Sequence, residues 1–282
     1  MNMQSPIAIF DSGLGGLTAM RQVAKYLPAE DIVYFGDTAR VPYGTKSPHT
    51  IERFAKEVLH FLLRFEPRVI VAACNTVSAT ALPVLRCNCD IPIFGVVIPG
   101  CAAALRMSKT HRIGVIGTEA TIRAGAYHDT ITSHNPSAKV VSKACPLLVP
   151  IVEEGRQDDD SIVKAVLNEY LAPLKEENVD TVVLGCTHYP LLHDAIQREM
   201  GGDVRIVDSG VEVARAVRSE LERSDMLSAE NRESRYEFYA SDNAARFGEI
   251  AQRFLGQMLQ HVSLVEPGEH FPDQAVIYTI QE

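Results

Sequence analysis

The stretch that decides the fold is residues 47–76, with the sequence SPHTIERFAKEVLHFLLRFEPRVIVAACNT. Ser47 supplies an N-cap oxygen and Pro48 suits the first helical position, so a helix is predicted to begin here. Apolar residues three and four apart mark one buried face of this helix, and Pro67 ends the pattern. A β-branched run follows directly and predicts a buried strand over 68–73. A helix that leads into such a strand is typical of an α/β fold.

The same alternation continues along the rest of the chain. Strands are predicted for seven short apolar runs, namely Ile7–Phe10, Asp31–Phe35, Arg68–Ala73, Ile93–Val97, Arg112–Ile116, Thr181–Leu184 and Arg205–Val207. Helical patterns separate these runs, so we expect largely parallel sheets joined by βαβ crossovers. Parallel sheets of this kind bind their ligands beyond the carboxyl ends of the strands. The residues that follow each strand are therefore the candidates for a functional site.

Two of the predicted strand-to-helix turns are similar to each other. Residues 69–76 have the sequence VIVAACNT, and residues 181–188 have the sequence TVVLGCTH. Each is an apolar strand that ends in a small residue, followed by a cysteine and two polar residues. Two related α/β halves that face each other would bring Cys74 and Cys186 to one cleft, whereas a chance likeness between two apolar strands is the alternative.

The composition excludes several classes of protein. The chain has 282 residues, of which 46% are hydrophobic and 22% are charged, as in an ordinary globular protein and unlike a disordered or fibrous one. Its formal net charge of −9 argues against nucleic acid or an anionic membrane as a partner, although local backbone donors can still bind a small anion. No apolar run reaches the roughly 20 residues of a membrane helix, and no secretory signal is present. We therefore expect a cytoplasmic protein whose six cysteines are thiols.

Cys74 and Cys186 are the main candidates for chemistry. Both are predicted at a turn from strand to helix, where the backbone N–H groups of the helix lower the pKa of a thiol and attract a carboxylate. A single free cysteine is more often a small buried hydrophobe. Two cysteines in matching positions, each followed by hydrogen-bonding side chains, favour a functional role. A metal site at Cys186 and His188 is the competing interpretation, but no paired ligand cluster accompanies them.

A glycine-rich loop, Asp11-Ser12-Gly13-Leu14-Gly15-Gly16, follows the first predicted strand. Its spacing departs from the dinucleotide-binding fingerprint and the Walker lysine is missing, so we do not expect nucleotide binding. The carboxylate of Asp11 would repel a phosphate but suits an ammonium group or an acid/base role. Further candidates at the same predicted sheet edge are the loop 36–45, Thr118 with Thr121, and the acidic pair Glu153-Glu154, of which either glutamate could face the cleft.

Five segments of the chain carry recognisable motifs, namely Ile9–Leu17, Tyr34–Gly44, Ala73–Ala79, Gly114–Thr118 and Leu184–Pro190. Together, and in this order, they resemble the glutamate racemases, cofactor-independent enzymes that interconvert L- and D-glutamate for bacterial peptidoglycan. No motif after about Asp208 matches. The resemblance implies two pseudo-symmetric α/β domains with largely parallel sheets and an active site in the cleft between them. Residues 1–98 plus 209–282 would form the first domain, and residues 99–208 the inserted second domain.

The resemblance also implies roles for individual residues. Cys74 and Cys186 correspond to the two acid/bases that act on opposite faces of the substrate α-carbon. Asp11 corresponds to the acid that accompanies the first cysteine, and His188 with Glu153 to the groups that accompany the second. The substrate-contacting positions of the family are here Asp11, Ser12, Tyr43, Gly44, Asn75, Thr76, Thr118, Thr187 and His188. No metal or cofactor is implied, a homodimer is expected, and direct contact with nucleic acid or membrane is not.

Three alternatives remain open. The wider aspartate/glutamate racemase family also acts on aspartate and hydantoins, although the loop around Tyr43-Gly44 favours glutamate. A metal-dependent hydrolase would use Cys186 and His188. A non-catalytic role in protein binding is the third alternative, because some members of the family are reported to bind gyrase.

Overall fold

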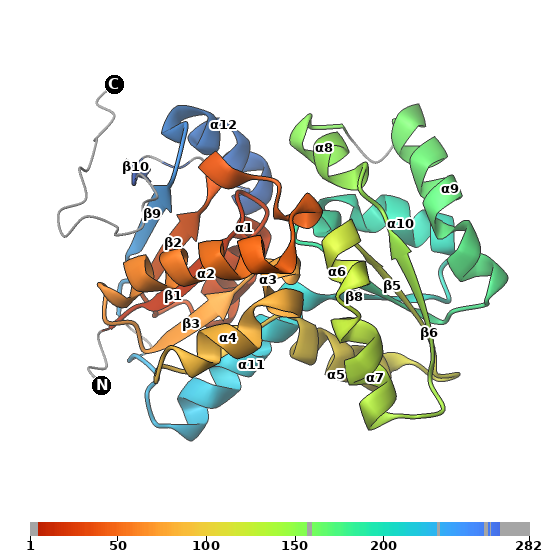
Figure 1. The fold of residues 1–282 in the computed structure, drawn as a ribbon, viewed down its shortest axis with the longest axis horizontal. Helices are drawn as coiled ribbons and strands as arrows, with labels where there is room; N and C mark the ends of the chain where they lie inside the picture. The colour runs from red at the N-terminus through yellow and green to blue at the C-terminus, as the bar shows by residue number, and fades with distance from the viewer. Residues whose placement is uncertain (1–4, 157–159, 230–231, 257–258, 260, 266–282) are drawn as a thin grey trace.

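The structure is a computed structural model that describes residues 5–156, 160–229, 232–256, 259 and 261–265 (Figure 1). Within these residues, the chain forms two separate parallel β-sheets, each flanked by helices. The first sheet and its helices, drawn in red, orange and blue, are called the first half below. The second sheet and its helices, drawn mostly in yellow-green and green, are called the second half.

The first half contains a six-stranded sheet in the order β10-β9-β2-β1-β3-β4. Its strands are β1 (Ile7–Asp11), β2 (Ile32–Gly36), β3 (Val69–Ala72), β4 (Ile93–Gly95), β9 (Tyr236–Ala240) and β10 (Ser263–Leu264). Its helices are α1 (Leu17–Tyr26), α2 (Pro48–Leu63), α3 (Asn75–Thr80), α4 (Leu82–Cys87), α11 (Ser209–Arg223) and α12 (Ala244–Leu255), with the 3₁₀ turns η1 (Thr38–Arg40) and η2 (Tyr43–Thr45). Every residue of β1, β2 and β3 is buried, which explains why their sequences are nearly continuous apolar runs.

The second half contains a four-stranded parallel sheet in the order β6-β5-β7-β8. Its strands are β5 (Arg112–Gly117), β6 (Lys139–Ala144), β7 (Thr181–Gly185) and β8 (Arg205–Asp208). Its helices are α5 (Val97–Met107), α6 (Glu119–Arg123), α7 (Ala126–His134), α8 (Leu148–Glu153), α9 (Ser161–Glu176) and α10 (His193–Met200), with the 3₁₀ turn η3 (Tyr189–Leu192).

The chain passes between the two halves twice. Strand β4 of the first sheet leads into α5, and β8 of the second sheet leads into α11, which packs against both α1 and α5. A hydrogen bond also joins the halves directly, because the hydroxyl of Thr18 donates to the carbonyl oxygen of Thr187 at 2.8 Å. The carboxyl ends of β1, β2, β3, β5 and β7 are therefore brought to a common cavity.

The structure confirms the predicted α/β class with parallel sheets, and each of the seven predicted strands is present. The helix predicted after Ser47 is also present, and the Ser47 hydroxyl accepts the N–H of Thr50 at 3.3 Å. The predicted fourth strand was too long, since Val97 already begins α5. Strands β6, β9 and β10 were missed. The first of these lies at a sheet edge and is partly exposed, so its sequence is not a continuous apolar run.

Among the described residues, no helix is both long enough and apolar enough to cross a membrane. Residues 266–282, which the expected first domain includes, lie outside the described residues.

Candidate active site

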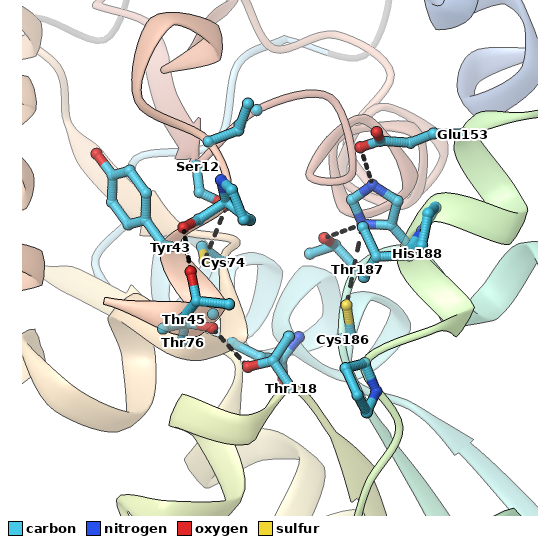
Figure 2. Close-up of a pocket in the computed structure, with 18 of the residues that line it drawn as sticks. Ser12, Tyr43, Thr45, Cys74, Thr76, Thr118, Glu153, Cys186, Thr187 and His188 are labelled. Carbon is cyan, nitrogen blue, oxygen red and sulfur yellow. Dashed lines mark hydrogen bonds and ion pairs between the residues drawn. The ribbon is translucent and has the colours of Figure 1, made fainter. Parts of the chain in front are cut away.

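A cavity of about 320 Å³ lies between the two halves (Figure 2). In Figure 2, Ser12, Tyr43 and Cys74 line one side, and Cys186 and His188 line the other. The sequence-predicted residues that line this cavity are Ser12, Tyr43, Gly44, Cys74, Asn75, Thr76, Thr118, Glu153, Cys186, Thr187 and His188. The remaining candidate, Asp11, is buried next to Ser12. The structure thus brings together residues that follow β1, β2, β3, β5 and β7, with Glu153 from α8.

Cys74 lies directly between β3 and α3. Its buried thiol donates to the hydroxyl of Ser12 across 3.4 Å. Burial and, to a smaller extent, the carboxylate of Asp11 raise the pKa of this thiol to about 12, so Cys74 keeps its proton at neutral pH. The backbone N–H of Val77 in the first turn of α3 lowers this pKa, as expected of a helix N-terminus, but the net shift is upward. Desolvation outweighs the dipole of a helix that has only six residues.

Cys186 follows β7 and has a basic neighbour. Its Sγ lies 3.9 Å from Nδ1 of His188, and Nε2 of the same ring lies 3.0 Å from Oε1 of Glu153. Burial opposes charge on this imidazole, but hydrogen bonds with Cys186 and Glu153 outweigh burial and raise the pKa of His188 to about 10. The hydrogen bond to His188 also lowers the pKa of Glu153. An imidazolium in this position stabilises negative charge on the Cys186 sulfur.

The two neighbouring glutamates have different partners. Glu153 faces His188, whereas the exposed side chain of Glu154 pairs with Arg156 at 3.2 Å. The first half also contacts the His188–Glu153 pair. The ring of Phe254 in α12 packs edge-on against the imidazole at a centroid distance of 5.4 Å. The structure therefore selects Glu153 from the two residues that the sequence left open.

Two buried polar side chains beside Cys74 each have one atom without a hydrogen-bond partner among the described residues. Oδ2 of Asp11 accepts the N–H of Gly13 at 3.0 Å, but Oδ1 has no partner. Oδ1 of Asn75 accepts from the hydroxyl of Tyr127 at 2.6 Å, but Nδ2 has no partner. Because buried polar atoms are normally satisfied, a free acceptor and a free donor at a cavity suit a ligand with an ammonium group and a carboxylate.

Three threonine hydroxyls form a cluster across the two halves. Oγ1 of Thr76 lies 3.0 Å from Oγ1 of Thr118 and 3.2 Å from Oγ1 of Thr121. Thr118 also caps α6, because its hydroxyl accepts the N–H of Thr121 at 3.2 Å. Thr118 therefore both lines the cavity and caps a helix. A Cβ at Gly44 would lie 2.8 Å from Cβ of Thr118, so only glycine lets the 36–45 loop approach this cluster.

The phenol of Tyr43 anchors this loop and points away from the cavity (Figure 2). Its hydroxyl donates to the buried carboxylate of Asp37. The same carboxylate accepts from the hydroxyl of Ser241 at 2.8 Å and from Nε of Arg40 at 2.7 Å. Asp37 therefore connects the loop to Ser241, which follows β9. The sequence did not indicate this role, because Ser241 lies far along the chain.

The glycine-rich loop packs against the second half. A Cβ at Gly15 would lie 2.2 Å from Oγ1 of Thr187 and 2.5 Å from Nδ1 of His188. Position 15 therefore has no side chain, which allows the two halves to come into contact beside the cysteines. The glycines of this loop are evident in the sequence, but their contact with Thr187 and His188 is seen only in the structure.

The cavity lining also includes Glu119, Pro146, Val149 and Pro150, which the sequence analysis did not identify. The last three are apolar side chains from the segment before and within α8, where no polar pattern marks a site. No lysine or arginine is among the described residues that line the cavity. An anionic ligand would therefore be bound by N–H and O–H donors.

The described part of the chain has no group of three or more histidine, cysteine, aspartate or glutamate residues arranged to hold a metal ion. All six cysteines are free thiols.

Comparison with known proteins gives consistent matches. Residues 12–217 match the family described as Asp/Glu/Hydantoin racemase. A glutamate racemase of Geobacter metallireducens is 46% identical over 91% of this chain and 94% of its own length. The crystal structure of a glutamate racemase isoform from Bacillus anthracis has a TM-score of 0.90 at 38% identity, and covers 94% of this chain and 98% of that one.

A second crystal structure bears on the ligand. The glutamate racemase of Francisella tularensis, solved in complex with D-glutamate, has a TM-score of 0.88 at 36% identity. The match covers 95% of this chain and 100% of that one.

Proposed function

This chain belongs to the Asp/Glu/Hydantoin racemase family, and from that premise we propose that it interconverts L- and D-glutamate with two cysteines as acid and base. The observation that carries the proposal is the placement of Cys74 and Cys186. Each lies within two residues of the carboxyl end of a strand, the two strands belong to different sheets, and both cysteines line one cavity. Glutamate is proposed as the substrate because similar proteins of known name are glutamate racemases.

Inversion of a stereocentre by proton transfer needs a base on one face of the α-carbon and an acid on the other. The His188 imidazole, whose pKa is raised to about 10, lies 3.9 Å from the Cys186 sulfur, whereas burial keeps Cys74 protonated. The Cys186 thiolate takes the α-proton of one enantiomer, and the C–H electron pair remains on the substrate as a carbanion. Cys74 then donates its proton to the opposite face of that carbanion. The site now holds a Cys74 thiolate and a Cys186 thiol, which is the starting state for the other enantiomer.

The unpartnered atoms of Asn75, which lines the cavity, and of Asp11, which is buried next to it, suit the substrate. Oδ1 of Asp11 would accept a hydrogen bond from the ammonium group, and Nδ2 of Asn75 would donate to a carboxylate. The hydroxyls of Thr76 and Thr118 supply further donors. Because the charge of an α-carbanion spreads onto the α-carboxylate, fixed donors at that group stabilise the transition state.

Substrate binding would also prepare Cys74 to act as a base. Besides burial, the negative charge of Asp11 raises the pKa of the Cys74 thiol. A substrate ammonium beside Asp11 would offset that charge and so favour the thiolate.

The proposal has finer parts that need their own tests. D-Glutamate made in this way would supply peptidoglycan synthesis, the reaction would need no added cofactor, and the chain would form a homodimer. We also propose that residues 1–98 plus 209–282 and residues 99–208 are the two domains. The separation of β1–β4, β9 and β10 from β5–β8 into different sheets supports this division.

The test is incubation of L-glutamate with the purified protein in D₂O, with EDTA and without any cofactor. We expect the α-proton signal to disappear and the optical activity to fall to zero. Cys74→Ser and Cys186→Ser should each abolish racemisation, and Cys87→Ser, at an exposed thiol outside the cavity, is the matched control. Full activity in either of the first two variants would contradict the two-cysteine mechanism.

The same experiment with L-aspartate and with a hydantoin decides between glutamate and the other substrates of the family. Faster exchange on either of these than on glutamate would overturn the substrate assignment. Sedimentation of the purified protein tests the homodimer.

A further inference from the structure

We infer that Tyr127 is a positioning residue, which orients the side-chain amide of Asn75 so that its N–H donor faces the substrate. The inference rests on the proposed function, because the donor of Asn75 has a purpose only if the cavity binds a carboxylate. Tyr127 does not line the cavity and belongs to no motif identified in the sequence. It acts through Asn75.

The hydroxyl of Tyr127 is held in a fixed position. The residue lies at the start of α7, and its ring is only 2% exposed within the apolar core of the second half. A Cβ at Gly100 would lie 3.6 Å from the ring, and one at Gly185 would lie 3.4 Å from it, so α5 and β7 both pass close to the ring at a glycine. Burial raises the pKa of this phenol well above its ordinary value, so the hydroxyl keeps its hydrogen.

The geometry indicates which end of the Asn75 amide meets this hydroxyl. The distance from Oη of Tyr127 to Oδ1 of Asn75 is 2.6 Å. That length is typical of an O–H···O hydrogen bond and shorter than the usual N–H···O range of about 2.7–3.2 Å. Oδ1 therefore faces the phenol, which leaves Nδ2 without a partner among the described residues.

The orientation matters because the two ends of an amide are almost identical in shape but opposite in polarity. With Nδ2 free, Asn75 offers a donor to a carboxylate. With the amide reversed, Asn75 would present a carbonyl oxygen, which repels that carboxylate. The described lining of the cavity has no lysine or arginine, so each hydrogen-bond donor contributes strongly to binding the two carboxylates of glutamate.

The hydrogen bond also connects the two halves. Asn75 is the first residue of α3 in the first half, and Tyr127 belongs to α7 in the second half, which contacts α3. A donor directly after Cys74 is thus oriented by the half that carries Cys186. Correct orientation of this donor requires the halves to be in contact.

The test is a double-mutant cycle with Tyr127→Phe and Asn75→Ala. A tenfold change corresponds to about 1.4 kcal/mol, a size that is typical for the loss of one partner of a buried polar group. We therefore expect Tyr127→Phe to lower kcat/KM about tenfold and to raise KM, since the carboxylate is bound before the proton moves. In the Asn75→Ala background, Tyr127→Phe should change kcat/KM less than twofold, because the residue through which it acts is gone.

Tyr170→Phe is the matched control. It also removes a phenol hydroxyl from the second half, where Tyr170 accepts the N–H of Leu147 at 3.4 Å, and it should leave KM unchanged. Thermal unfolding of each variant shows that it is folded. An unchanged KM in Tyr127→Phe would overturn the inference, and so would a loss that multiplies fully with that of Asn75→Ala, since a purely structural tyrosine behaves in that way.

Failure of the proposed function gives a different result. If the wild-type protein does not exchange the α-proton of glutamate, the proposed reaction is wrong. Calorimetric binding of D-glutamate to wild-type and Tyr127→Phe protein then decides the inference by itself, with an affinity about tenfold lower in the variant as the expected result and equal affinities as the contrary one.

Discussion

Replacement of Glu153 by glutamine should move the pH dependence of racemisation without disrupting the fold. Oε1 of Glu153 lies 3.0 Å from Nε2 of His188, and glutamine keeps the shape of the side chain but carries no negative charge. The pKa of His188 is raised to about 10, although burial opposes this, because Cys186 and Glu153 both favour the imidazolium. Loss of the carboxylate removes one of these two contributions. The imidazolium that supports a Cys186 thiolate will then be lost at a lower pH.

The expected size of the change follows from the exposure of the pair. A hydrogen bond that involves a charged group contributes about 1.5–3 kcal/mol. The side chain of Glu153 is 36% exposed, so solvent screens the interaction and the lower end, about 1.5 kcal/mol, applies. Since 1.36 kcal/mol corresponds to one pH unit in a titration, the alkaline fall in kcat/KM should move from near pH 10 to about one unit lower.

The assay is racemisation followed by circular dichroism from pH 7 to 10.5, with L- and D-glutamate as separate substrates. The equilibrium constant between enantiomers is unity, so kcat/KM must change equally in both directions. Glu154→Gln is the matched control, because Glu154 pairs with Arg156 at the surface and not with the imidazole. An alkaline limb that stays in place, or moves to higher pH, in Glu153→Gln would refute the assigned role of the glutamate.

Other perturbations test the surrounding structure. Gly15→Ala, which places a Cβ 2.2 Å from Oγ1 of Thr187, should separate the halves and reduce kcat/KM by more than about a hundredfold (at least 2.7 kcal/mol of lost stabilisation) in the same dichroism assay. Asp37→Asn should raise KM about tenfold because it weakens the anchor of the 36–45 loop, and an unchanged KM would contradict that role. Glu30→Ala should lower stability by about 3–5 kcal/mol in urea unfolding, since it removes the carboxylate that pairs with the fully buried guanidinium of Arg68. That pair lies at the amino ends of the strands, away from the cavity, so turnover of folded Glu30→Ala at 25 °C should match the wild type.

Local pattern was sufficient for most of the fold. The N-cap at Ser47, the apolar face after it and the buried run of β3 each record a local requirement, so the sequence predicted the helix and the strand almost to the residue. Strand β6 escaped prediction because an edge strand is only partly buried and needs no continuous apolar run. Strands β9 and β10 complete the first sheet by pairing with β2 and with each other, a partnership between distant segments that no local pattern encodes.

The candidate site divides in the same way. Short motifs placed Cys74, Asn75 and Cys186 after strands, and the rule that parallel sheets bind ligands at their carboxyl ends brought them together. Motifs did not show whether Glu153 or Glu154 faces the cavity, because this depends on which of the two side chains contacts His188 in the folded protein. They also failed for the pKa of Cys74, since desolvation depends on everything packed around the thiol.

The sequence by itself therefore determined the fold class and the family and singled out the two cysteines that line the cavity, because these depend on residue type and spacing along the chain. Only the tertiary structure decided how the two thiols differ. One is buried beside a carboxylate and keeps its proton, and the other lies 3.9 Å from an imidazole whose charge is favoured by a glutamate. The physical reason is that hydrogen bonding, burial and electrostatic interactions depend on distances in space. The residues that set these distances, such as Tyr127 for Asn75, come from the opposite half of the molecule.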